Sequence, residues 1–152
     1  MNLCCDVLKA LEGKTLVTAE SCTGGGIGAA LTAIPGSSAV YKGGVICYTD
    51  WVKRNILSVN QQLLAEYGAV SAPVAEEMAK GVRKLLQADI AVSVTGLAGP
   101  GGDDFGNPVG TVYIGFCSNT KSLVNRFVFS GDRESVRRQT VLAALEMVLN
   151  NI

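Results

Sequence analysis

The chain has 152 residues, of which 48% are hydrophobic and 17% are charged, and its 13 basic and 13 acidic residues give a formal net charge of zero. This length predicts a single domain over residues 1–152, and the balanced charge excludes the basic surface typical of nucleic-acid-binding proteins. Because charged residues are fewer than the usual quarter, we expect part of the surface to be covered in a homo-oligomer.

The first half of the chain alternates helices with short strands. Apolar residues with helical spacing predict a helix over residues 2–12, followed by a strand over 15–19 and a helix over 25–33. The next strand is expected over 40–49, where Gly43 and Gly44 indicate a bulge or the close approach of another group. Short helices are then predicted from Thr49 or Asp50, either of which can be the cap, to Leu57, and over 60–67.

The second half begins with a strong helix. Pro73 is a favoured first helical residue, and a continuous apolar stripe extends from Val74 to Leu86. The nearly all-apolar segment 89–95 predicts a central strand. A glycine-rich loop over 96–109 precedes two strands, 110–117 and 123–129, with a hairpin connection between them. The last helix is expected over 133–149, with Asp132 as its cap.

This order of elements predicts an α/β fold. Helices between the first three strands indicate a three-layer α/β/α sandwich, and the hairpin makes the sheet mixed, with at least one antiparallel strand. Ligands bind at the carboxyl ends of the parallel strands in such sheets. We therefore expect the loops 20–26, 48–53 and 96–109 to meet at one site.

The N-terminus and the cysteines bear on the compartment. Residues 1–6 lack the charged and apolar regions of a signal peptide, and no apolar run is long enough to span a bilayer. The 5 cysteines have neither metal-site nor disulfide-framework spacing. We expect a cytoplasmic protein with reduced thiols and no membrane contact.

The first of the three loops holds a candidate nucleophile. Ser21 precedes a three-glycine run, where nearby backbone N–H groups from about Cys22 to Gly25 can stabilise an oxyanion. Alternatively, Ser21 or Thr23 is only a helix cap. Cys22 is a rival nucleophile, and a phosphate cradle matches poorly because the stretch is neither GxxxxGK[ST] nor GxGxxG.

The chain contains 0 histidines, which excludes Ser-His-Asp and Cys-His catalysis. A lysine with a lowered pKa can replace histidine as the base. Lys53 and Lys42 are the candidates near the predicted site. Lys53 is expected in the first turn of its helix, where the dipole and burial would both disfavour the ammonium; otherwise it is a solvated surface lysine. Tyr48 can supply a hydroxyl donor.

Several charged side chains have both a structural and a functional interpretation. Asp103 and Asp104 can hold a magnesium ion with a phosphorylated ligand, although solvated loop charges are the commoner role. Arg133, Arg137 and Arg138 either form a solvent face or anchor a substrate phosphate. We expect no bound metal and no cofactor.

Motifs along nearly the whole chain resemble the CinA C-terminal domain family. They occur in the family's order: "TAESCTGG", "GSSAVYKGGVICYT", "YGAVSAPVAEEMAKG", "SVTGLAGPGG", "PVGTVYIGF" and "GDRESVRRQT". The resemblance implies an anticodon-binding-domain-like fold whose five-stranded mixed sheet has one antiparallel strand. It also implies a nicotinamide-nucleotide amidase of pyridine-nucleotide recycling, which converts nicotinamide mononucleotide to nicotinic acid mononucleotide and ammonia.

By the same resemblance the serine nucleophile corresponds to Ser21, the lysine base to Lys53 and the strand-end tyrosine to Tyr48. We expect the substrate to contact Cys22, Thr23, Gly24, Gly25, Gly44, Thr95, Gly96, Gly99, Arg133 and Arg137. The family often carries a larger N-terminal domain, whose activity does not carry over. The alternative function is a non-catalytic module of the competence and damage-inducible type that binds a nucleotide and regulates a partner.

Overall fold

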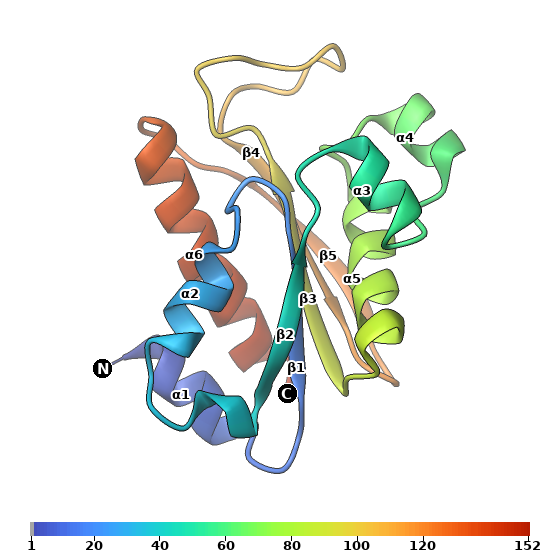
Figure 1. Cartoon of the computed structure of the whole chain (residues 1–152). Coiled ribbons are helices and arrows are strands. Elements are labelled where there is room, and N and C mark those ends of the chain that lie inside the picture. Colours follow the sequence, from blue (N-terminus) through green and yellow to red (C-terminus); the bar gives the residue numbers. More distant parts are fainter. Residues whose placement is uncertain (1) are drawn as a thin grey trace.

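A five-stranded sheet in the order β2-β1-β3-β4-β5 forms the middle layer of the computed structural model, which describes residues 2–152 (Figure 1). The strands are β1 (Leu16–Glu20), β2 (Tyr41–Ile46), β3 (Ile90–Gly96), β4 (Thr111–Cys117) and β5 (Ser122–Val128). β1 pairs in parallel with both β2 and β3, whereas β4 is antiparallel to both β3 and β5. Only β4 therefore runs against the rest, and the predicted mixed sheet with one antiparallel strand is confirmed.

Helices cover both faces of the sheet. α1 (Leu3–Ala10), α2 (Gly26–Thr32) and α6 (Arg133–Asn150) lie on one face, and α3 (Asp50–Asn55), α4 (Gln61–Tyr67) and α5 (Ala72–Leu86) lie on the other (Figure 1). A separate cluster of buried apolar side chains fills each of the two interfaces between sheet and helices. The predicted three-layer α/β/α architecture is thus confirmed.

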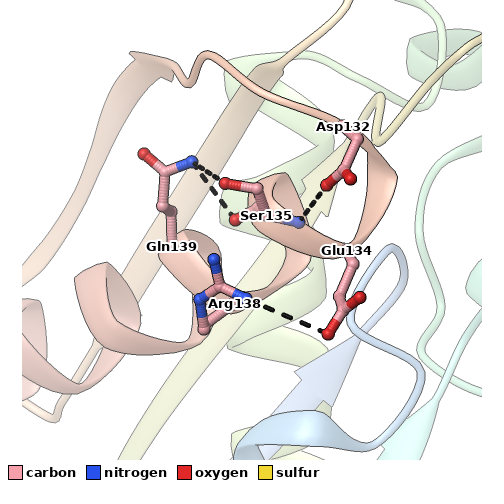
Figure 2. A network of polar contacts seen from close by, with 5 residues as sticks. All are labelled: Asp132, Glu134, Ser135, Arg138 and Gln139. Atoms are coloured by element: carbon pink, nitrogen blue, oxygen red, sulfur yellow. Dashed lines mark hydrogen bonds and ion pairs between the residues drawn. The ribbon is translucent and has the colours of Figure 1, made fainter.

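Capping residues set where several helices begin. Thr49 accepts a hydrogen bond from the Val52 N–H and starts α3, as one of the two predicted caps. Asp132 starts α6 by accepting from the Ser135 N–H at 2.9 Å (Figure 2). Side-chain oxygens at these positions satisfy amide groups that have no partner inside the helix.

Most strand boundaries differ from the prediction by a single residue, and two of the differences lie beside the cavity edge of the sheet. β1 continues through Glu20, because this residue still pairs with Ile46 and Val94 on its two neighbours. β2 ends at Ile46 instead of residue 49, since the chain turns after Cys47 into α3. The predicted bulge is present: the register shifts between Leu16 and Val17, and Gly43 has a positive φ of 150°.

All 5 cysteines have free thiols, and only Cys5 is exposed. No helix within residues 2–152 combines the length and the apolar character needed to cross a membrane.

Candidate active site

The carboxyl ends of β1, β2 and β3 point to the same edge of the sheet, and a cavity of about 440 Å³ opens there. Its lining comes from the three predicted loops together with the turn before α5 and the start of α6: Ser21, Cys22, Tyr48, Asp50, Lys53, Ala69, Val70, residues 95–102 and Arg133. The expected meeting of these loops is confirmed. The contribution of the turn at Ala69 and Val70 was not anticipated, and Asp50, although it lies in the predicted loop 48–53, was considered only as a helix cap.

Ser21 and Lys53 lie in contact at this cavity. The Lys53 Nζ donates to the Ser21 Oγ at 3.0 Å and to the Cys47 carbonyl oxygen at 2.8 Å. Lys53 is only 1% exposed and Ser21 is 8% exposed. A buried lysine that faces a serine hydroxyl is an arrangement in which the amine can take the serine proton.

Burial lowers the pKa of Lys53 from its ordinary value, because water no longer solvates the ammonium. The expected help from the helix dipole is wrong. α3 has 6 residues, and Lys53 lies in its last turn, where the dipole favours a cation. Desolvation is therefore the cause of the lowered pKa.

The neighbouring thiols do not offset this effect at neutral pH. Burial raises the pKa of Cys22 to about 12 and that of Cys47 to about 11. Both thiols are therefore uncharged near pH 7. Asp50 is then the one anion among the groups that favour the Lys53 ammonium.

The loop after Ser21 leaves backbone amides available for an oxyanion. The Gly24 N–H donates to the Ser21 carbonyl oxygen at 3.1 Å and closes a tight turn. Gly24 and Gly25 both have positive φ angles, 57° and 98°, which glycine adopts without steric cost. Within residues 2–152, the N–H groups of Cys22 and Thr23 donate to no other protein group.

The proposed capping of α2 by Ser21 or Thr23 is wrong. Gly25 is the N-cap and has no side chain to donate or accept. Instead, the carboxylate of Glu20 accepts from the N–H groups of Ile27 and Gly28 at 2.8 and 3.0 Å. It also accepts from the Thr23 hydroxyl at 2.7 Å.

Sequence reasoning missed Glu20, which is only 2% exposed. A glutamate beside a glycine-rich loop is usually solvated. Glu20 precedes the two amides that it binds by 7 and 8 residues. No standard helix cap has this spacing, so the sequence offers no cap signal for Glu20.

Tyr48 and Arg133 lie together at the rim of the cavity. The Arg133 guanidinium donates to the Tyr48 hydroxyl oxygen at 3.1 Å and to the Gly99 carbonyl oxygen at 2.8 Å. The hydroxyl proton of Tyr48 thus remains free to be donated. Arg133 joins α6 to the glycine-rich loop and presents a positive charge to the cavity.

Thr95, Gly96 and Gly99 line the cavity as expected. The Thr95 hydroxyl donates to the Ala69 carbonyl oxygen at 2.8 Å and ties β3 to the turn before α5. A Cβ on Gly96 would lie 2.6 Å from the Val112 side chain, so this glycine is needed for packing against β4.

Of the other predicted substrate contacts, Cys22 lines the cavity, whereas Thr23, Gly24, Gly25, Gly44 and Arg137 do not. A side chain at Gly44 would clash with the Thr18 hydroxyl of the neighbouring strand, so its role is the close pairing of β2 with β1. Arg137 instead binds the carbonyl oxygens of Cys22 and Thr23. The predicted substrate contacts of Gly44 and Arg137 are therefore replaced by structural ones.

The remaining candidates do not line the cavity. Lys42 donates to the Gln87 carbonyl oxygen at 3.3 Å. Asp103 accepts from the amides of Phe105 and Asn107 and organises its own loop. Among residues 2–152, no group of three or more potential ligands could hold a metal ion.

Comparisons with known proteins agree with this architecture. The family model described as the CinA C-terminal domain matches residues 2–152 of this chain. CinA-like proteins of Parasynechococcus marenigrum and Thermotoga neapolitana are 48% and 45% identical over 89% and 88% of this chain. The chain covers 33% and 32% of those proteins and so spans about a third of the length of the curated relatives it matches.

Solved structures match over nearly their full length. The competence damage-inducible protein A of Klebsiella pneumoniae is 40% identical with a TM-score of 0.96, covering 98% of this chain and 94% of that one. A competence-damaged protein (CinA) superfamily protein of Escherichia coli is 38% identical with a TM-score of 0.97, covering 99% and 89%.

Proposed function

The chain belongs to the CinA C-terminal domain family, and we propose that it is a nicotinamide-nucleotide amidase that hydrolyses nicotinamide mononucleotide with a Ser-Lys pair. One observation carries the proposal: the buried amine of Lys53 lies 3.0 Å from the hydroxyl of Ser21. The family resemblance supplies the substrate, and the site supplies a nucleophile and a base without histidine.

Acylation begins with the neutral amine. A neutral Lys53 has two N–H groups, one of which donates to the Cys47 carbonyl, and a lone pair that accepts the Ser21 proton. The Ser21 Oγ attacks the carboxamide carbon, and the amides of Cys22 and Thr23 stabilise the oxyanion. A positioned donor of this kind contributes roughly 3 kcal/mol. The Lys53 ammonium then protonates the amide nitrogen, and ammonia leaves.

Deacylation repeats these steps with water. After acylation, Ser21 carries the nicotinoyl group as an ester, and Lys53 is neutral because it has given its proton to the leaving ammonia. The amine of Lys53 then takes a proton from water. The hydroxide attacks the ester carbonyl carbon, the bond to Oγ breaks, and Ser21 recovers its proton from Lys53. The second product is nicotinic acid mononucleotide.

The cavity suits a mononucleotide. Its volume of about 440 Å³ lies within the range of small-molecule sites. Arg133 provides a positive charge at the rim for the phosphate, and Tyr48 provides a hydroxyl donor. The glycine-rich segment 99–102 allows the ligand to approach the backbone closely.

The test measures ammonia released from nicotinamide mononucleotide by the wild type and by three variants. We expect Ser21→Ala and Lys53→Met to lose at least a thousandfold in kcat, because each removes a reacting group. Methionine keeps the volume of the buried lysine side chain. Lys42→Met is the matched control, since Lys42 lies on β2, does not line the cavity and donates to the Gln87 carbonyl oxygen, and it should retain full activity.

The pH dependence is a second readout. Because burial lowers the pKa of Lys53, kcat/KM should rise with pH through a value below the ordinary 10.5 and then level off. Ammonia release that survives Ser21→Ala would contradict the proposed nucleophile. Binding of the nucleotide by the wild type without ammonia release would instead support the non-catalytic binding module.

A further inference from the structure

We propose that Arg137 is a positioning residue that orients the oxyanion-binding peptides of the Ser21 loop. This inference rests on the proposed function, since it concerns the same nucleophile. Arg137 extends from α6 to a loop that lies more than a hundred residues earlier in the chain. Its Nε donates to the Cys22 carbonyl oxygen at 3.0 Å, and its Nη2 donates to the Thr23 carbonyl oxygen at 3.1 Å.

Because a peptide group is planar, holding its carbonyl also fixes the direction of its N–H group. The C=O of one residue and the N–H of the next point in opposite directions across a trans peptide. When the guanidinium holds the Cys22 carbonyl, it turns the Thr23 N–H away from α6. Likewise, the Gly24 N–H, opposite the Thr23 carbonyl, points away from Arg137 and donates to the Ser21 carbonyl oxygen at 3.1 Å. That bond in turn orients the peptide that carries the Cys22 N–H.

Other contacts already hold the second of these peptides: the Thr23 carbonyl oxygen also accepts from the Gly26 N–H at 3.0 Å, and the Thr23 hydroxyl donates to Glu20 at 2.7 Å. Gly24 and Gly25 have positive φ angles, and glycine loses more conformational freedom on ordering than other residues do. Glu20 binds the amides of Ile27 and Gly28 further along, but it does not contact the carbonyls of Cys22 and Thr23. Within residues 2–152 the Cys22 carbonyl oxygen accepts from no other protein group, so Arg137 is the side chain that constrains the Cys22–Thr23 peptide, which carries the Thr23 N–H.

The competing role for Arg137 is phosphate binding. Two of its nitrogens already bind the loop, and the residue does not line the cavity. Arg133, one helical turn earlier, does line it. A substrate without the phosphate separates these two roles.

The experiment compares Arg137→Ala with Arg138→Ala. Arg138 is the matched control, because it is the next residue on α6, does not line the cavity and pairs with Glu134 at 4.0 Å (Figure 2). We measure kcat and KM for nicotinamide mononucleotide and for nicotinamide riboside, which lacks the phosphate. Arg137→Ala should lower kcat about tenfold to a hundredfold for both substrates with little change in KM, because an oxyanion donor is displaced and not removed. Arg138→Ala should match the wild type.

A loss confined to the phosphorylated substrate, or one that appears only in KM, would assign Arg137 to phosphate binding and overturn the proposal. Thermal unfolding checks that both variants fold. Arg137→Lys should recover only part of kcat, since an ammonium cannot reproduce the fixed geometry of the guanidinium.

The binding of a boronic acid tests the positioning role of Arg137 without any turnover of substrate. 3-Pyridineboronic acid adds to a serine oxygen and forms a tetrahedral anion that resembles the intermediate. Arg137→Ala should raise the inhibition constant of the boronic acid, or its Kd, by the same factor by which it lowers kcat. If the wild type releases no ammonia yet binds the boronic acid through Ser21 in an Arg137-dependent way, the amidase proposal fails and the positioning role stands. Equal binding by the wild type and Arg137→Ala would overturn the positioning role.

Discussion

Ser21 and Cys22 are adjacent side chains of similar size, and their surroundings assign them different chemistry. Ser21 faces the amine of Lys53, whereas the pKa of Cys22 is raised to about 12 by burial. A thiol reacts as the thiolate, so a thiol with this pKa is a poor nucleophile at neutral pH. In the proposed mechanism the serine is therefore activated by its neighbour, and the cysteine is not.

Alkylation tests this difference. At pH 8 a thiol with a pKa of about 12 is ionised about once in ten thousand molecules. Iodoacetamide should therefore label the exposed Cys5 of the native protein and leave Cys22 unmodified, without loss of activity. Peptide mass spectrometry locates the label, and urea-unfolded protein, in which all thiols react, is the control. Rapid labelling of Cys22 with parallel inactivation would restore it as a rival nucleophile.

Two buried charged side chains mark the limit of residue-level prediction. The absence of histidine pointed to a lysine base, but nothing local in the sequence indicates that Lys53 is 1% exposed. Its burial depends on loops distant in the chain. Glu20 was expected in a loop, and glutamate is rarely buried, yet four donors surround its carboxylate. Tertiary contacts override residue preference at both positions.

At the scale of elements, the placement of α3 decides where Lys53 lies. A Cβ on Gly81 of α5 would clash with the backbone carbonyl oxygen of Leu57, just after α3. The absence of a side chain at Gly81 lets the end of α3 approach α5. The helices themselves were predictable from periodicity and caps. The strand order and this contact were not, because they join segments that are far apart in the chain.

Gly81→Ala tests the contact. Alanine normally stabilises a helix interior by about 1 kcal/mol relative to glycine. Here we expect the opposite, a loss of roughly 1–3 kcal/mol from overpacking, together with a lower kcat as Lys53 moves away from Ser21. Urea unfolding and ammonia release measure the two effects. Lys84→Ala, at an exposed position on the same helix, should change neither, and a Gly81→Ala protein of increased stability would show that the contact is not restrictive.

For the whole molecule, the candidate active site lowers the stability of the folded state. Lys53 is held where its ammonium is poorly solvated, and such groups persist when the surrounding fold stabilises the site enough. The two apolar clusters on opposite faces of the sheet supply that stability. The expected homo-oligomer would add to it and stays a prediction, which analytical ultracentrifugation can test.

The pH dependence of global unfolding measures this cost. Between the lowered pKa of Lys53 in the folded protein and the ordinary 10.5 of the unfolded chain, the unfolded state binds more protons, so the wild type gains stability as pH rises. Below the folded pKa the amine is protonated in both states, and the full penalty is present. Above 10.5 it is neutral in both states, and the penalty vanishes.

Lys53→Met removes the titrating group. The free energy of unfolding of the variant minus that of the wild type should therefore fall as pH rises through this window, by about 1.4 kcal/mol for each pH unit between the two pKa values. The lost bond to the Cys47 carbonyl shifts this difference equally at every pH and does not alter its slope. Urea unfolding from pH 6 to 10 gives the slope, with Lys42→Met as the control that should show none. A difference for Lys53→Met that stays constant over this range would mean that the amine keeps its ordinary pKa in the folded protein, and the proposed base would then be protonated at neutral pH.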